Sequence, residues 1–260
     1  MTLVGWVSWL VAVPASSFEP HPHNGILEPF KRQPPKRYNM VVSADVDRKL
    51  QAGKTFIDRK DLDNGFRRTI AIKNIDAPAS IIFDQIVDVA SYPSKIDGII
   101  GTDVYSDERN LNGLHTIYAR YRVRFAALVA ESYVYHEIDP FTRCMTFHLD
   151  YSRKSDVSDQ IGYWWVEPLG RDRSRVFYAA VSTVPVWVPP FAVGSILDLV
   201  AKRALSWVDV ESRKAFAARS PPPTVLIRGL MDRLGKLKLS QGFPRAGLQG
   251  RAAVNAKRSE

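Results

Sequence analysis

The chain has 260 residues, of which 45% are hydrophobic and 24% charged, and it can bury one sizeable core. One domain with terminal tails is the most economical interpretation. Its single cysteine, Cys144, excludes an intrachain disulfide and a cysteine-rich zinc site, so we expect Cys144 to be a small residue within a sheet.

The net charge of +9 is concentrated at the ends of the chain. Residues 1–40 carry four basic and two acidic side chains, and residues 219–260 carry nine basic and two acidic ones, which leaves residues 41–218 without net charge. A neutral central region argues against a nucleic-acid-binding face. The basic C-terminal tail can still contact phosphate groups of lipid or nucleic acid.

The N-terminal segment resembles a targeting sequence. LVGWVSWLVAVPASS is apolar but too short to span a bilayer, and small residues that suit cleavage follow it. ASSFEP, at residues 15–20, resembles the cleavage motif of bipartite presequences in algae with secondary plastids. We therefore expect a plastid protein, with secretion, mitochondrial delivery or a disordered N-terminus as the alternatives.

The folded region is predicted to open with one strand and two short helices. Residues 66–75 alternate apolar and charged side chains, as a strand does. Asp76 suits the N-cap and Pro78 the first turn of a helix with an apolar stripe over residues 81–89. A second short helix is predicted around residues 92–99.

Five antiparallel strands are predicted to follow. Residues 116–125 alternate between apolar side chains on one face and tyrosine or arginine on the other, so one face is buried. The other strands are predicted at 128–138, 143–151, 160–168 and 175–184, between segments rich in turn-forming residues. No crossover helix interrupts them, which predicts an antiparallel sheet.

A long amphipathic helix is predicted to close the domain. It starts at Pro189 or Pro190 and ends before Ser220, because the prolines at 221–223 cannot continue a helix. Apolar residues recur at spacings of three and four, so one face packs along the sheet. Curved strands and a long helix do not fill the space between them, which predicts a cavity walled by aromatic and aliphatic side chains.

This order of elements resembles the START-like (SRPBCC) helix-grip superfamily, which includes polyketide cyclases and coenzyme Q-binding proteins. IDAPASIIFDQIVDVASYPSKI resembles the opening of that family and KRALSWVDVESRKA its closing helix. LDYSRKSDVSDQIGYWWVEP, with RVFYAAVSTVPVWVPPF, is similar to an uncharacterised branch from photosynthetic eukaryotes. Phe83 departs from the pattern, since many relatives have tryptophan there.

The resemblance covers roughly residues 66–218 and implies an α+β helix-grip fold. In that fold a curved antiparallel sheet wraps on a long C-terminal helix, and two short helices follow the first strand. We therefore divide the chain into a targeting or disordered segment (1–40), a START-like domain (41–218) and a basic tail (219–260).

The resemblance also implies binding, transfer or sequestration of an apolar small molecule, such as a lipid, quinone or isoprenoid, in an internal cavity. By position, the residues expected to line it are Tyr121, Val123, Phe147, Leu149, Tyr163, Trp165, Tyr178, Ile196, Val200 and Trp207. Core packing is the alternative for each, because large aromatic side chains are commonly buried. We expect no cofactor.

A cyclase- or hydrolase-type enzyme that uses polar residues of the same cavity is the alternative function. A buried histidine or aspartate facing the cavity would favour it. His115, His136 and His148 lie in or beside predicted strands, without the spacing of a metal or nucleophile motif. His148 and Asp150 share a face opposite the apolar residues, so we expect both at the surface and assign no catalytic residue.

The loop with Asp156 and Asp159 is interpreted as a turn in which one of these carboxylates binds backbone amides. Two carboxylates are too few for calcium, and basic neighbours neutralise them. We therefore expect no metal site.

The tail segment 225–239 is predicted to be a basic amphipathic helix that lies on an anionic membrane. The residues expected to contact the membrane are Leu226, Arg228, Leu230, Arg233, Leu234, Lys236, Leu237 and Lys238. The alternatives are a helix that folds back on the domain and a segment that stays disordered until bound. A third function, an adaptor whose tail binds a protein or nucleic acid, predicts a collapsed cavity. We expect a monomer.

Overall fold

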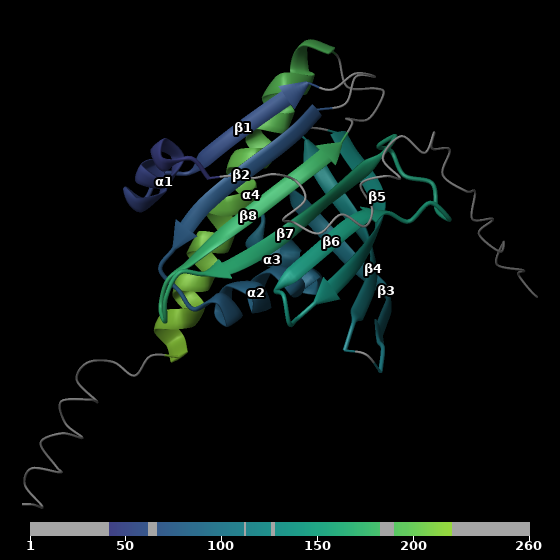
Figure 1. Cartoon of the computed structure of the whole chain (residues 1–260). Coiled ribbons are helices and arrows are strands. Elements are labelled where there is room, and N and C mark those ends of the chain that lie inside the picture. The colour runs from purple at the N-terminus through teal and green to yellow at the C-terminus, as the bar shows by residue number, and fades with distance from the viewer. Residues whose placement is uncertain (1–41, 62–66, 112, 126–127, 183–189, 220–260) are drawn as a thin grey trace, which may run out of the picture. The chain divides into compact units, whose positions relative to one another are not determined.

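The computed structural model describes residues 42–61, 67–111, 113–125, 128–182 and 190–219, with backbone alone at some element ends and over residues 190–202. Figure 1 shows a curved sheet crossed by one long helix. The elements are α1 (Ala44–Gln51), β1 (Phe56–Asp61), β2 (Arg67–Ile75), α2 (Ala79–Val87), η4 (Val89–Ser91), α3 (Tyr92–Lys95), β3 (Ile99–Arg109), β4 (His115–Phe125), β5 (Leu128–Asp139), β6 (Cys144–Leu149), β7 (Gln160–Pro168), β8 (Ser174–Ser182) and α4 (Pro190–Arg219).

The eight strands form one antiparallel sheet in the order β1-β2-β8-β7-β6-β5-β4-β3. Strands β3 to β8 follow one another as a meander, and β2 then pairs with β8 from Arg67↔Ser182 to Ile75↔Ser174. This pairing places the first strands of the domain beside the last one. The α+β helix-grip fold expected from the sequence is confirmed.

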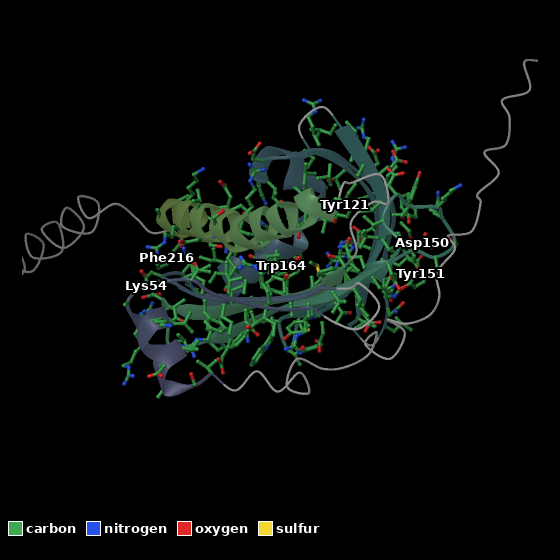
Figure 2. All side chains as sticks on the ribbon, turned by 90° about the horizontal axis from the view of Figure 1, so that it is seen from above. Lys54, Tyr121, Asp150, Tyr151, Trp164 and Phe216 are labelled. Carbon is green, nitrogen blue, oxygen red and sulfur yellow. The ribbon has the colours of Figure 1, made fainter. Side chains whose placement is uncertain are left out.

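The sheet is covered on both faces (Figure 2). We call the face toward α4 the grip face; it also carries α2 and α3, and it holds the larger core cluster. The opposite, outer face packs against α1, whose Leu50 is fully buried with Ile70, Tyr163 and Phe177. Arg175 of β8 fixes α1 there through an ion pair of 2.5 Å with Asp47.

The C-terminal half of α4 is bound to the grip face by packing and by charge. Leu205 and Val208 are fully buried in the grip-face cluster. Lys73 of β2 lies 2.7 Å from Asp209, which also accepts a hydrogen bond of 2.6 Å from Arg213. Burial alone would raise the pKa of Asp209, but the hydrogen bonds from Arg213 and Lys73 lower it.

Several sequence expectations about the elements need correction. The strand predicted as the first is the second, because α1 and β1 precede it, and β3 was not predicted. Short, polar segments such as FIDRKD carry little alternation. Asp76 does not cap α2: Pro78 occupies the N-cap, and the Asp76 carboxylate pairs with Arg213 at 3.2 Å.

By contacts the chain divides into two units, Met1–Phe216 and Ala217–Glu260. The predicted boundaries at 40 and 218 stay predictions, since the adjoining residues lie outside the described ranges. Among the residues that the structure describes, no helix is long and apolar enough to cross a bilayer.

Candidate ligand-binding site

Seven aromatic side chains form a closed circuit on the grip face. Neighbouring ring centroids lie 4.5–6.5 Å apart, the spacing of interacting aromatic pairs. We call this set the aromatic circuit; in order its members are Tyr92, Tyr121, His136, Phe147, Tyr178, Trp164 and Trp207. Four sheet strands from β4 to β7, with β8, α3 and α4, contribute to it, so it exists only in the folded chain.

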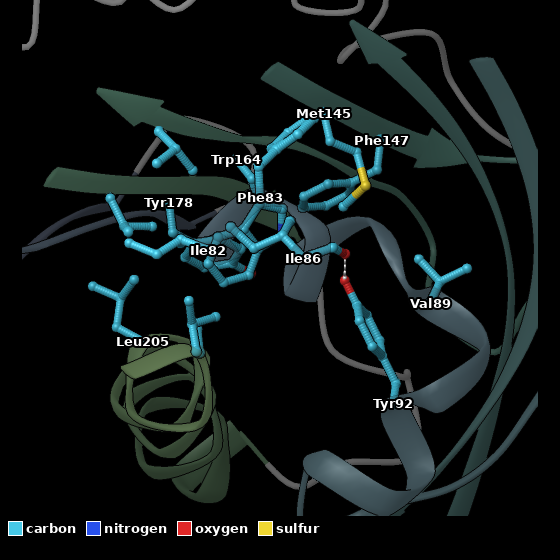
Figure 3. Packing of buried hydrophobic residues seen from close by; sticks show 14 of the residues in the cluster. Ile82, Phe83, Ile86, Val89, Tyr92, Met145, Phe147, Trp164, Tyr178 and Leu205 are labelled. Carbon is cyan, nitrogen blue, oxygen red and sulfur yellow. Dashed lines mark hydrogen bonds between the residues drawn. The ribbon is translucent and has the colours of Figure 1, made fainter. Parts of the chain in front are cut away.

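The circuit surrounds apolar side chains of α2. Figure 3 shows Ile82 and Ile86 in the middle of the cluster, with Leu205 of α4 beside them. These three residues have no accessible surface, whereas the six circuit members other than His136 each keep 5–8%. A water-sized probe therefore still reaches the circuit while the aliphatic centre is closed.

The only polar pair inside the circuit is His136 with Tyr121, among the residues described. His136 Nδ1 lies 3.2 Å from the carbonyl oxygen of Ile117, which only accepts, so Nδ1 carries the proton. Nε2 then accepts from the Tyr121 hydroxyl at 3.0 Å. Burial lowers the pKa of His136 to about 4, so the imidazole is neutral at pH 7.

The other two tyrosines of the circuit differ in their hydroxyl groups. The Tyr92 hydroxyl donates to the backbone oxygen of Ile86 at 2.5 Å, which ties α3 to α2. The Tyr178 hydroxyl makes no hydrogen bond to any described residue, and burial raises its pKa to about 12.

Gly162 makes room for the circuit on β7. A Cβ atom there would lie 2.4 Å from the Phe147 ring and 2.4 Å from the carbonyl oxygen of Ala179. Phe147, opposite Gly162 in the register, lies over the glycine, so any larger residue would displace it.

The structure places most of the predicted lining residues on the grip face. Tyr121, Phe147, Leu149, Tyr178 and Trp207 belong to the grip-face cluster, and Val123 packs against it. Ile196 and Val200 lie on α4 where side chains are not described, and the eight tail positions lie outside the described residues. Whether the placed residues bind a ligand stays a prediction.

Tyr163 and Trp165 lie on the outer face and cannot line a cavity between the sheet and α4. Both belong to the cluster that α1 covers, where Trp165 stacks on Phe177 at 4.7 Å. Their neighbour Trp164 is the grip-face residue. Both faces of β7 are apolar because both are covered, so alternation along this strand did not identify the inner one.

Sequence reasoning also missed Tyr92 and the inward position of His136. Alternation of Val134, His136 and Ile138 on β5 could have placed His136 inside, since both neighbours are apolar. Tyr92 had no such signal, because it lies at the start of a single-turn helix.

The remaining polar candidates have structural partners. Half-buried His148 lies on the outer face, with its ring 4.7 Å from Tyr135. Asp150 is buried rather than exposed, because the Tyr105 hydroxyl donates to it at 2.7 Å and Arg153 lies beside it. His115 pairs with Asp107 at 2.6 Å.

The acidic loop is a turn, as predicted. Asp156 accepts a hydrogen bond from the backbone amide of Glu131 at 2.6 Å, and Asp159 accepts one from Gln160 at 2.8 Å. Cys144 is buried on the outer face, and burial raises its pKa to about 12. Within the described ranges, no three histidine, cysteine or acidic side chains come together as metal ligands do.

Comparison with solved structures finds START proteins among the matches. A START superfamily protein from Mycobacterium smegmatis is 16% identical, with 56% of this chain and 97% of that one covered and a TM-score of 0.48. The fold is START-like.

Two further matches with a START-like fold are an aromatase/cyclase and a human protein. The Zhui aromatase/cyclase from Streptomyces sp. R1128 is 14% identical, over 58% of this chain and 93% of that one, with a TM-score of 0.48. Human STARD10 is 12% identical, over 78% of this chain and 90% of that one, with a TM-score of 0.48. No protein-family model and no curated protein matches the sequence. At these identities the likeness concerns the fold alone.

Proposed function

We propose that this protein binds an apolar small molecule, such as a lipid, a quinone or an isoprenoid, between the sheet and α4, and transfers or sequesters it. The aromatic circuit supports this proposal, because it offers flat apolar surface that a probe still reaches. Burial of an apolar ligand contributes about 25 cal/mol per Å², less the cost of ordering it. No catalytic group is needed for such binding.

Adjacent tryptophans on opposite faces of β7 provide the test. The full chain is purified from a lipid-containing host, and co-purifying molecules are identified by native and denaturing mass spectrometry. Trp164→Leu, on the grip face, should lose the bound molecule, whereas Trp165→Leu, on the outer face, should keep it. Val123→Trp adds bulk at a half-buried position beside the circuit and should also exclude the ligand.

Loss of the ligand in Trp165→Leu but not in Trp164→Leu would place binding elsewhere. A wild-type protein that carries no stoichiometric apolar molecule, and takes none up from liposomes, would overturn the proposal. Circular dichroism of each variant separates loss of the site from loss of the fold.

The proposal extends to a membrane surface and to the plastid. The basic amphipathic pattern at 225–239 supports contact with anionic lipid, and the motif at 15–20 supports plastid delivery. In flotation assays the full chain should bind vesicles containing phosphatidylglycerol more than vesicles of phosphatidylcholine, and Leu230→Asp with Leu234→Asp should abolish the difference. A fluorescent protein fused to residues 1–40 should enter plastids of such algae.

A cyclase- or hydrolase-type enzyme is the second candidate, and the inward position of His136 favours it. His136 lies inside the circuit within hydrogen-bond distance of Tyr121, where a polar substrate group would meet both. A neutral imidazole with both nitrogens occupied nevertheless has the pattern of a structural histidine. A mass change of the extracted ligand on incubation with wild-type protein, absent with Tyr121→Phe, would support catalysis.

A further inference from the structure

Three tyrosine hydroxyl groups enter the grip-face core, and two of them have structural roles. Tyr92 donates to Ile86 and Tyr121 to His136, at 2.5 and 3.0 Å. Tyr178 is 8% exposed, and its hydroxyl has no hydrogen bond to any described residue. Most buried polar groups are paired, and one left unpaired costs about 1–3 kcal/mol, so this exception requires an explanation.

Packing does not require the Tyr178 hydroxyl. The ring lies 4.5 Å from Trp164 and stacks on Phe147 at 6.3 Å, contacts that a phenylalanine ring would make equally well. The residue opposite Tyr178 on β2 is Ala71, and Ala180 follows two positions along the same face. These small apolar neighbours leave the hydroxyl without a polar group of the sheet beside it.

We propose that the Tyr178 hydroxyl is the hydrogen-bond donor for the ligand, and that the ligand is an apolar ring molecule with a ketone or quinone carbonyl at this point. This inference rests on the proposed function. The protons of Tyr92 and Tyr121 are already used, so Tyr178 is the one of the three with a proton to give. A carbonyl oxygen only accepts and therefore complements it, whereas a pure hydrocarbon would leave the hydroxyl unpaired.

The surroundings of Tyr178 favour a flat ligand. Trp164, Phe147 and Trp207 offer ring faces and edges around it, and aromatic side chains interact best with offset or edge-on planar groups. A ring ligand would use these contacts along its whole surface, while the carbonyl fixes its orientation toward β8.

The test uses two probes that differ in one group. Fluorene and fluorenone share the same tricyclic skeleton, and only fluorenone has a carbonyl. Their affinities for the full chain are measured by quenching of tryptophan fluorescence. Wild-type protein should bind fluorenone about twofold to tenfold more tightly than fluorene, the range that one net hydrogen bond supplies.

Tyr178→Phe should bind both probes equally, with the affinity for fluorene unchanged. Tyr163→Phe removes a hydroxyl from the outer face of the neighbouring strand and should keep the preference. The melting temperature of Tyr178→Phe should equal or exceed that of the wild type, because an unpaired polar group is removed.

The failures of the two proposals are distinguishable. If both probes bind equally to the wild type, or the preference survives in Tyr178→Phe, the role of Tyr178 is overturned while apolar binding stands. A marked fall in the melting temperature of Tyr178→Phe would show that the hydroxyl is structural and would overturn it too. If neither probe binds the wild type, both proposals fail for ring ligands.

Discussion

The Tyr121 hydroxyl donates to His136 Nε2 over 3.0 Å, inside a core cluster that is otherwise almost wholly apolar. Because Nδ1 donates to Ile117, this contact fixes one tautomer of a neutral histidine. The pair can thus orient a polar ligand group without a buried charge. It also links protein stability to pH.

Stability should fall as the pH drops from about 6.5 to about 4. Burial lowers the pKa of His136 to about 4 in the folded protein, below the value of ~6.5 in an unfolded chain. In this window the unfolded state binds more protons, so stability is complete above it and about 3 kcal/mol is lost across it. Urea denaturation at several pH values measures this loss.

His136→Gln is the variant for this experiment, because it removes the titrating group. Its stability should change less between pH 6.5 and pH 4 than that of the wild type. His148→Gln, on the outer face, is the control and should keep the wild-type slope. Equal slopes in wild type and His136→Gln would refute the assignment.

Two fully buried serines should respond differently to the same substitution. Ser174 donates to the carbonyl oxygen of Ala77 at 2.9 Å, so Ser174→Ala leaves that oxygen unpaired and should cost about 1–2 kcal/mol. Ser212 Oγ has no partner within the described part of the chain, so Ser212→Ala should be neutral or stabilising. Chemical denaturation of both variants tests the contrast, and equal losses would contradict it.

Asp209 should be the more important of two acidic residues on α4. It is 16% exposed and pairs with Lys73 of β2, so Asp209→Asn should lower the free energy of unfolding by about 1–3 kcal/mol. Glu211 pairs with the exposed Lys214 within the helix, so Glu211→Gln should change it by less than about 0.5 kcal/mol. Thermal unfolding at pH 7 compares them, and a similar effect of both would argue against an anchoring role for Asp209.

Gly162→Ala should be strongly destabilising, by more than about 2 kcal/mol, because the new methyl group would overlap both the Phe147 ring and the β8 backbone. Gly170→Ala has open space around the added atom and should be close to neutral. Melting temperatures of the two variants decide this. Near-ultraviolet circular dichroism should also change in Gly162→Ala, since Phe147 belongs to the aromatic circuit.

The sequence by itself determined the strands β4 to β8, the helix α4 and their order. Each of these segments has a regular apolar period and is bounded by turn formers or prolines, so local signals suffice. They were missing for α1, β1 and β3, which are short or polar and depend on contacts with distant residues. The START-like resemblance supplied the arrangement that periodicity alone does not give.

Only the tertiary structure decided which residues meet. Trp164 and Trp165 are equivalent in the sequence, and the packing of α1 on the outer face buries one while α4 buries the other side of the strand. The aromatic circuit joins residues from seven elements, so no local pattern could predict it. Pairing between distant strands, from β2 with β8 onward, sets these contacts, because register and face follow from which strands are neighbours.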